Sequence, residues 1–116
     1  MDSLVIDEKN KEYYTNLNRN LFNEKQLSQI DIGYKRNLDI SWYCNPKFSH
    51  AQMFEIRIAL QNNLSESQLK FLCDEKWNNE QMREIRLAMV YNVDYTLFAD
   101  PSFSAEQMRT IRIDLE

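Results

Sequence analysis

The chain has 116 residues, 43% of them hydrophobic and 28% charged, which is enough for one domain with a modest core. Its net charge of −4, with acids and bases interleaved, excludes the strongly basic surface typical of nucleic-acid-binding proteins. A single glycine and two prolines disfavour hairpin-rich folds, and no apolar run approaches the ~20 residues of a membrane span. We therefore expect an all-α, cytoplasmic protein.

The first twenty residues do not share the repeated pattern of the rest. Tyr13, Tyr14 and Leu17 fit a short helix that would cover the first repeat, and the stretch SLVI could be an ordered or a loose arm. We therefore assign residues 1–20 to an N-terminal cap or arm and residues 21–116 to a repeat region.

From residue 21 onward the same short sequence motif, which we call the phrase, occurs four times. Three clear copies read FSHAQMFEIRIAL, WNNEQMREIRLAM and FSAEQMRTIRIDL, and a degenerate copy reads FNEKQLSQIDIGY. The copies begin at Phe22, Phe48, Trp77 and Phe103, with spacings of 26, 29 and 26 residues. Such periods are typical of stacked helical units that cannot bury their apolar faces alone. We predict a single-domain array of alternating longer and shorter helices.

Each phrase begins with the pattern of a helix start. Asn or Ser is a favourable N-cap, and Gln stands three residues later, as in a capping box with a hydrophobic staple around it. The pairs are Asn23/Gln26, Ser49/Gln52, Asn78/Gln81 and Ser104/Gln107, with a fifth, Ser65/Gln68, inside the middle link. We interpret the recurrent Gln-Met as part of a helix start and not as a site motif.

After the cap, apolar residues recur with the helical period and predict the buried stripe. A small residue at Gly33, Ala59 and Ala88 would let a neighbouring helix approach closely, and Asp114 replaces it in the last copy. The substitution indicates that the neighbour is absent there.

A shorter helix is predicted in each link. LDISWYCNPKF corresponds residue for residue to VDYTLFADPSF, with Asp39 and Asp94 as caps and a proline that ends the helix. The middle link, LSESQLKFLCDEKW, is three residues longer and lacks proline, so its helix should gain about one turn.

No cluster of residues indicates catalysis, a metal or a cofactor. Cys44 and Cys73 share the position of Ala99, which favours small buried thiols over a disulfide or a reactive thiol. His50 begins a predicted helix with no nucleophile at a suitable spacing, and two cysteines with one histidine cannot complete a zinc site without carboxylates. We expect no enzyme, no metal and no cofactor.

Arginine follows the core isoleucine in three copies, at Arg57, Arg86 and Arg112. One interpretation is an ion pair between units, for example with Asp74 or Asp100 near the end of a short helix. The other is an exposed arginine row that contacts an acidic partner or phosphates. Both interpretations remain open.

Aromatic residues in and near the short helices exceed what a thin core needs. Because Trp and Tyr dominate protein interfaces, the candidate partner-binding residues are Trp42, Tyr43, Tyr91 and Tyr95, together with the three arginines. The stripe of Met108, Ile111 and Leu115 has no unit after it, so we expect it to fray or to mediate self-association as a homodimer.

The phrases FSAEQMRTIRIDLE and VDYTLFADPSFSAEQM resemble a tandem helical repeat found in proteins of conjugative elements, plasmids and phages of Gram-positive bacteria. Those repeats have a Q-M-x-x-I-R-x-G-L core and a link like D-V-S-x-Y-A-D-P-x-F. The likeness covers residues 22–116, although Ala or Asp stands where the family usually has Gly and the middle link is longer. It implies an accessory protein of a mobile element that acts by contact, and it brings no catalytic residue.

We therefore predict a non-enzymatic helical-repeat module that binds another protein. One alternative is a stoichiometric inhibitor of bacterial defence, of the anti-CRISPR or antirestriction type. A second alternative is nucleic-acid binding through the arginine edge, which the net charge disfavours.

Overall fold

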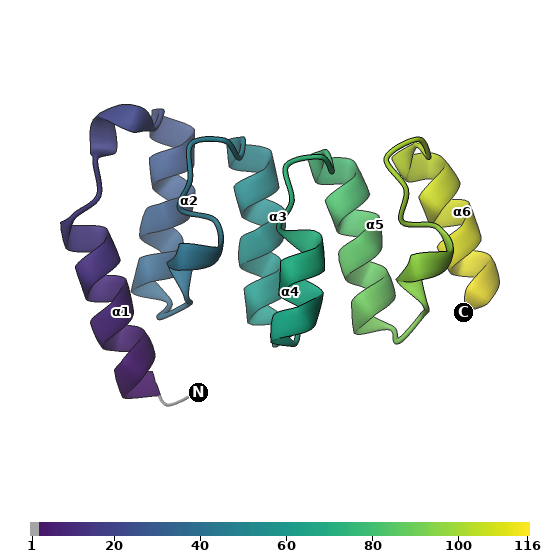
Figure 1. Cartoon of the computed structure of the whole chain (residues 1–116), viewed down its shortest axis with the longest axis horizontal. Coiled ribbons are helices and arrows are strands. Elements are labelled where there is room, and N and C mark those ends of the chain that lie inside the picture. The colour runs from purple at the N-terminus through teal and green to yellow at the C-terminus, as the bar shows by residue number, and fades with distance from the viewer. Residues whose placement is uncertain (1–2) are drawn as a thin grey trace.

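The long helices of the repeat region stand side by side in a row, and the short helices lie on one side of that row (Figure 1). The computed structural model describes residues 3–116, and their side chains from residue 8 onward. Within that range all regular structure is helical and there is no strand, which confirms the predicted all-α class. The elements are α1 (Ser3–Thr15), η1 (Arg19–Leu21), α2 (Glu24–Lys35), η2 (Ile40–Trp42), α3 (His50–Gln61), α4 (Glu66–Leu72), α5 (Asn79–Val90), η3 (Tyr95–Leu97) and α6 (Ala105–Leu115), where η marks a 3₁₀ helix.

The molecule is thin for its length, with extents of 44 × 30 × 17 Å. Helices α2, α3, α5 and α6 pack in sequence order; α4 packs against both α3 and α5, η2 packs against α1 and α2, and η3 packs against α5. Two layers of helices fit in the short dimension, because a helix with its side chains is about 10 Å wide. A thin stack of this kind has a narrow core and much surface.

All five predicted helix starts are confirmed. In each, the cap side chain accepts a hydrogen bond from the backbone N–H of the Gln, and the Gln side chain accepts one from the cap N–H. These bonds measure 2.8–3.2 Å. Each start therefore satisfies two backbone groups that would otherwise lack partners.

Three helices end in a left-handed residue, a feature that the sequence patterns above did not predict. Asn37, Asn63 and Asn92 have φ of 56°, 57° and 58°. Asparagine tolerates this conformation better than most residues and takes the place that glycine often fills after a helix. These three turns send the chain from a long helix into the following short one.

The links follow the prediction closely. Asp39 and Asp94 each cap a three-residue 3₁₀ helix, whereas the middle link contains the seven-residue helix α4. One position of each link points into the core and is almost fully buried: Tyr43, Leu72 and Phe98. The links therefore seal the row of long helices as well as connecting it.

Three of the five capping glutamines, at the starts of α2, α3 and α5, also bind the next unit. The Oε1 atom of each accepts the capping bond, and its Nε2 atom donates to the backbone oxygen of the aromatic residue that opens the following phrase. The distances are 2.7 Å from Gln26 to Phe48, 2.6 Å from Gln52 to Trp77 and 2.8 Å from Gln81 to Phe103. A weaker bond of 3.2–3.4 Å reaches the oxygen two residues earlier. One side chain thus joins the start of a helix to the start of its neighbour.

The single glycine is required by a tyrosine of the following link. A Cβ atom at Gly33 would lie 1.9 Å from the Tyr43 hydroxyl oxygen. That hydroxyl passes over Gly33 and donates a 2.7 Å hydrogen bond to the backbone oxygen of Gln29. The corresponding pairs in later units are Ala59 with Leu72 and Ala88 with Phe98, where no hydroxyl needs the space.

Helix α1 covers the first unit and is longer than expected. It includes Ser3, so the SLVI stretch is part of the helix rather than an arm, while residues 1–2 lie outside the described residues. Asn10 is buried, accepts a hydrogen bond from the backbone N–H of Ile40 and donates one to the oxygen of Leu38. Tyr14 stacks on Tyr34 with ring centroids 4.0 Å apart.

We expect Gln81→Glu to destabilise the fold by about 1–3 kcal/mol, because the carboxylate keeps the capping acceptor but loses the donor to Phe103. The matched control is Gln107→Glu, since Gln107 has the same cap and is exposed, and it should change stability by less than about 0.5 kcal/mol. Denaturant unfolding measures both. Equal losses in the two variants would contradict the bridging role.

Gly33→Ala should destabilise the fold by about 1–3 kcal/mol, because the new methyl group meets the Tyr43 hydroxyl. In a Tyr43→Phe background the same change should cost at least about 1 kcal/mol less, since the pair then matches Ala88 with Phe98. A double-mutant cycle from chemical denaturation measures the coupling. Additive effects would show that the hydroxyl does not select glycine.

Candidate interaction surface

The arginines form an internal row of inter-helix contacts. Arg86 Nε lies 3.3 Å from Glu55 Oε2, and Arg112 Nη2 lies 3.1 Å from Glu84 Oε1. Arg57 Nε donates to Gln29 Oε1 at 2.9 Å, so a neutral amide takes the place of the carboxylate in the first pair. In each case the arginine reaches back to the preceding long helix. The prediction of an ion pair between units is therefore confirmed for Arg86 and Arg112 and is wrong for Arg57.

The partners of the arginines and the exposure of their side chains differ from the two predictions. Asp74 and Asp100 lie in the links, whereas the observed partners occupy the long helices two positions before the equivalent arginine. Arg57 and Arg112 retain only 5% and 7% of their exposure, so they do not form an open row for an acidic partner or for phosphates. That interpretation was wrong because helix-to-helix packing carries these side chains between the long helices.

At the N-terminal end the same row reverses its charge. Asp31 stands where the other units have arginine, and the Tyr14 hydroxyl donates to it at 2.6 Å. The Arg19 guanidinium approaches the other carboxylate oxygen at 3.4 Å. The hydrogen bond to Asp31 raises the pKa of the Tyr14 hydroxyl. Helix α1 and the segment after it therefore supply the partners that a preceding unit would supply.

The aromatic candidates separate into buried and accessible residues. Tyr43 was wrongly predicted to bind a partner: it is fully buried, because its ring fills the core position of its link. Trp42 and Tyr95 are half-buried, and the Tyr95 ring lies 4.8 Å from that of Phe71. Tyr91 is 61% exposed, but it caps the C-terminal end of α5 and does not lie in a short helix.

We call the side of the row that carries η2, α4 and η3 the short-helix face (Figure 1). Aligning the links on the aromatic residue that follows them places Trp42, Phe71 and Leu97 at one position, six residues before it. Trp42 and Phe71 are half-buried and Leu97 is exposed. The sequence alone could have given this alignment. The comparison made above matched only the two links of equal length, so it did not include Phe71 of the middle link.

A groove of about 510 Å³, the Trp42 groove, lies between η2 and α4. Trp42 and Leu60 line it together with Leu64 and Leu69, and Lys9, Asp39 and Glu66 add charged groups. Trp42 also lines a second hollow of about 310 Å³ that contains Lys47 and Lys70. One large aromatic side chain therefore stands between an apolar groove and a basic hollow.

A smaller hollow repeats this arrangement one unit later. It measures about 240 Å³ and is lined by Met89, Val93 and Tyr95, which correspond to Leu60, Leu64 and Leu69. The short-helix face thus presents two such grooves one unit apart, and the one beside Trp42 is the larger of the two.

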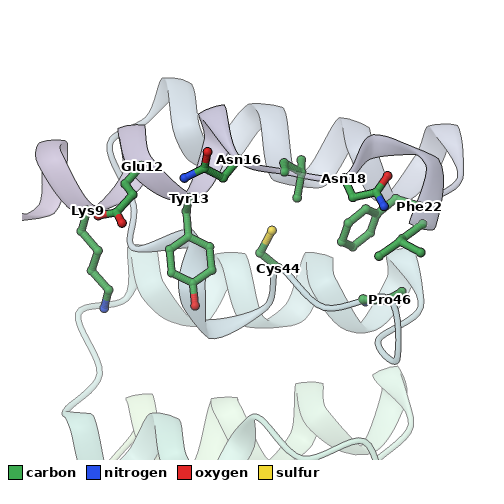
Figure 2. Close-up of a pocket in the computed structure, with 10 residues that line it drawn as sticks. Lys9, Glu12, Tyr13, Asn16, Asn18, Phe22, Cys44 and Pro46 are labelled. Carbon is green, nitrogen blue, oxygen red and sulfur yellow. The ribbon is translucent and has the colours of Figure 1, made fainter.

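A separate pocket of about 440 Å³ lies between α1 and the link after η2 (Figure 2). Tyr13 and Cys44 point into the same space, with Phe22 and Pro46 at its far end. Burial raises the pKa of Cys44 to about 11 and that of Cys73 to about 12, so both thiols stay protonated near neutral pH. Both are free, and the Cys44 pocket holds no histidine that could activate the thiol.

The predicted self-association stripe is not an open surface. Met108 is fully buried, because it packs inward on the rest of the array, and Ile111 is half-buried against the core. The positions of α6 that would meet a following unit are polar and exposed: Gln107, Thr110 and Asp114. Of the predicted stripe only Leu115, with 45% exposure, is accessible.

We expect Glu55→Gln to stabilise the protein relative to the parent by an amount that grows as pH rises from about 4 to 7. Burial raises the pKa of Glu55 despite the opposing Arg86, so the folded parent loses stability once this carboxyl ionises in the unfolded chain. Glutamine removes the titration and still accepts the arginine, as Gln29 does for Arg57. Urea unfolding of both proteins across this range measures the difference. A difference that stays flat or falls with pH would contradict this explanation.

Neither the geometry nor the comparisons identify a reaction centre. In the part of the chain with described side chains, no three His, Cys, Asp or Glu residues gather to hold a metal ion. Among the described helices, none combines the length and apolar character that crossing a membrane requires. No family model, curated protein or solved structure matches this chain.

Proposed function

We propose that this protein is a non-enzymatic module that binds another protein through its short-helix face. The observation that carries the proposal is Trp42, a large aromatic side chain that lines both an apolar groove and a basic hollow. Interface hot spots are enriched in tryptophan, and apolar grooves with charged margins suit the side chains of a protein partner. The resemblance to repeats of mobile elements extends the proposal to an accessory protein that acts by contact.

Charge favours a protein over a nucleic acid as the partner. The protein carries a net charge of −4, and binding to a phosphate backbone depends on many free cationic side chains. Arg86 and Arg112 are held by carboxylates of neighbouring helices, and Arg57 by an amide. The arginine edge therefore lacks the free charge that the nucleic-acid alternative needs.

The partner should be lost when Trp42 is changed to Ala, because the groove then loses one apolar wall. Affinity capture from the native host, with quantitative mass spectrometry, would compare the parent with this variant. We expect recovery of the partner to fall at least about tenfold, the effect of a hot spot worth ~1.4 kcal/mol.

Tyr91→Ala is the matched control, since Tyr91 is an exposed aromatic residue outside the short-helix face. It should retain the partner, and circular dichroism should show the same helicity for all three proteins. Equal recovery with Trp42→Ala, or loss with Tyr91→Ala alone, would contradict the proposed surface. Salt-sensitive oligonucleotide binding by the parent would favour the nucleic-acid alternative instead.

A further inference from the structure

Arg57 differs from the other two arginines of the row because neither of its hydrogen-bond partners carries a negative charge. Its Nε atom donates to Gln29 Oε1 at 2.9 Å, and its Nη1 atom donates to Gln61 Oε1 at 2.7 Å. Within the part of the chain that has described side chains, no carboxylate forms an ion pair with Arg57. The side chain is nevertheless buried, and a buried charge without an opposite charge is costly.

The equivalent arginine of the last unit shows which groups are missing. Arg112 Nη2 lies 3.1 Å from Glu84 Oε1, and Arg112 Nη1 lies 2.7 Å from Glu116 Oε1. Glu84 is the sixth residue after the N-cap of its helix, as Gln29 is in α2. Glu116 is the twelfth residue after its N-cap, as Gln61 is in α3. The same two positions therefore hold carboxylates around the last arginine of the row and neutral amides around the first.

A second arginine adds positive charge at the same point. Arg36 Nη1 donates to the Oε1 atom of Gln61 at 3.0 Å, so two guanidinium groups meet at one neutral oxygen. No ion pair of Arg36 occurs among the described side chains either. Burial and, as a smaller cause, the charge of Arg36 lower the pKa of Arg57. Two like charges that converge in this way attract an anion more strongly than either does alone.

The oxygen at which the two arginines meet is accessible from solvent. Arg36 and Gln61 are both exposed, and Gln61 is the last residue of α3, so its side chain is free to turn away. The Phe54 ring lies beside the site, with its centroid 5.2 Å from Arg57 Cζ, and Phe54 is itself 41% exposed. A ligand oxygen can therefore take the place of the Gln61 oxygen without any movement of the helices.

We infer that Arg36 and Arg57 bind a carboxylate side chain from an acidic segment of a partner protein. The carboxylate replaces the Gln61 amide oxygen and accepts hydrogen bonds from both guanidinium groups, which are strong when both partners are charged. A carboxylate is favoured over a phosphate because the other arginines of the row are held by glutamates.

This site lies outside the two hollows that Trp42 lines, since neither arginine contributes to them. It goes beyond the short-helix face and rests on the proposed function only for the presence of a protein partner. The arginine row as a whole is closed by its carboxylates, so the site is a single point and not a track for a phosphate backbone.

The test uses the full chain and two peptides with blocked ends, tetraglutamate and its neutral counterpart tetraglutamine. Nuclear magnetic resonance titration at about 0.15 M salt follows the Nε–H signals of the arginines and the side-chain amide of Gln61. Tetraglutamate should shift the signals of Arg36, Arg57 and Gln61 and should bind at least about tenfold more tightly than tetraglutamine.

Gln61→Glu supplies the missing carboxylate from within the chain, as Glu116 does for Arg112. The variant should bind tetraglutamate at least about tenfold more weakly than the parent and should unfold at a higher urea concentration at pH 7. Gln107→Glu is the matched control, because it makes the same change of charge at an exposed position of α6. It should change the affinity by less than about threefold.

Arg36→Gln should also weaken tetraglutamate binding at least about tenfold, because it leaves one guanidinium at the site. Arg109→Gln removes an exposed arginine from α6 and serves as its control, with an expected change of less than about threefold. Both substitutions remove one exposed positive charge, so a difference between them reports position and not net charge.

Equal binding of the two peptides, signal shifts confined to other residues, or unchanged affinity in Gln61→Glu would overturn the inference. A lower urea midpoint for Gln61→Glu would overturn it as well. Inorganic phosphate or a single-stranded oligonucleotide that binds these residues more tightly than tetraglutamate would replace the carboxylate with a phosphate ligand and so disprove the proposed partner.

Trp42→Ala separates this inference from the proposed function and should leave the affinity for tetraglutamate unchanged. If Trp42→Ala loses the captured partner but tetraglutamate fails to bind the parent, only the arginine site is disproved. If tetraglutamate binds as expected and capture is unaffected by Trp42→Ala, only the proposed function is disproved.

Discussion

The structure depends on a glutamine that performs two tasks at the starts of α2, α3 and α5. Its oxygen closes the capping box of its own helix, and its amide nitrogen holds the backbone at the start of the next unit. A capping bond is local and costs little chain entropy, whereas a bond between units fixes two helices relative to each other. Because one side chain makes both, the ordering of a helix start also orders its neighbour. The stack can therefore be thin and still have a defined geometry.

The row of arginines between the long helices also links each helix to the one before it. Buried arginines need partners, since an unpaired charge in this environment is costly. Each arginine obtains one from the preceding helix, so the row requires a special solution at the first unit. Asp31 with Tyr14 and Arg19 is that solution. At α6 the positions that face away from the array carry Thr110 and Asp114, which water can satisfy.

A two-layer stack places the links on its outer surface as well as against its core. The long helices bury their apolar stripes against each other and against the links, so the links also form the outer layer on one side. Some of their side chains, such as that of Tyr43, lie in the core, whereas the neighbouring Trp42 is half-buried and reaches the surface. Grooves then arise wherever one short helix faces the next. The grooves beside Trp42 and beside Tyr95 are of this kind.

Local interactions made much of this protein predictable from its sequence. Capping boxes, link caps and helix period act within a few residues, so the residues by themselves identify the helix starts and the extra length of α4. The partners of the arginines, the second bond of each glutamine and the burial of Tyr43 depend on residues 14–31 positions away, and only packing decides them. For the same reason the sequence alone marked Trp42 and Tyr43 as equivalent candidates. The tertiary structure separated them, because Trp42 is the last residue of η2 and half-buried, whereas Tyr43, the residue that caps η2, places its ring in the core.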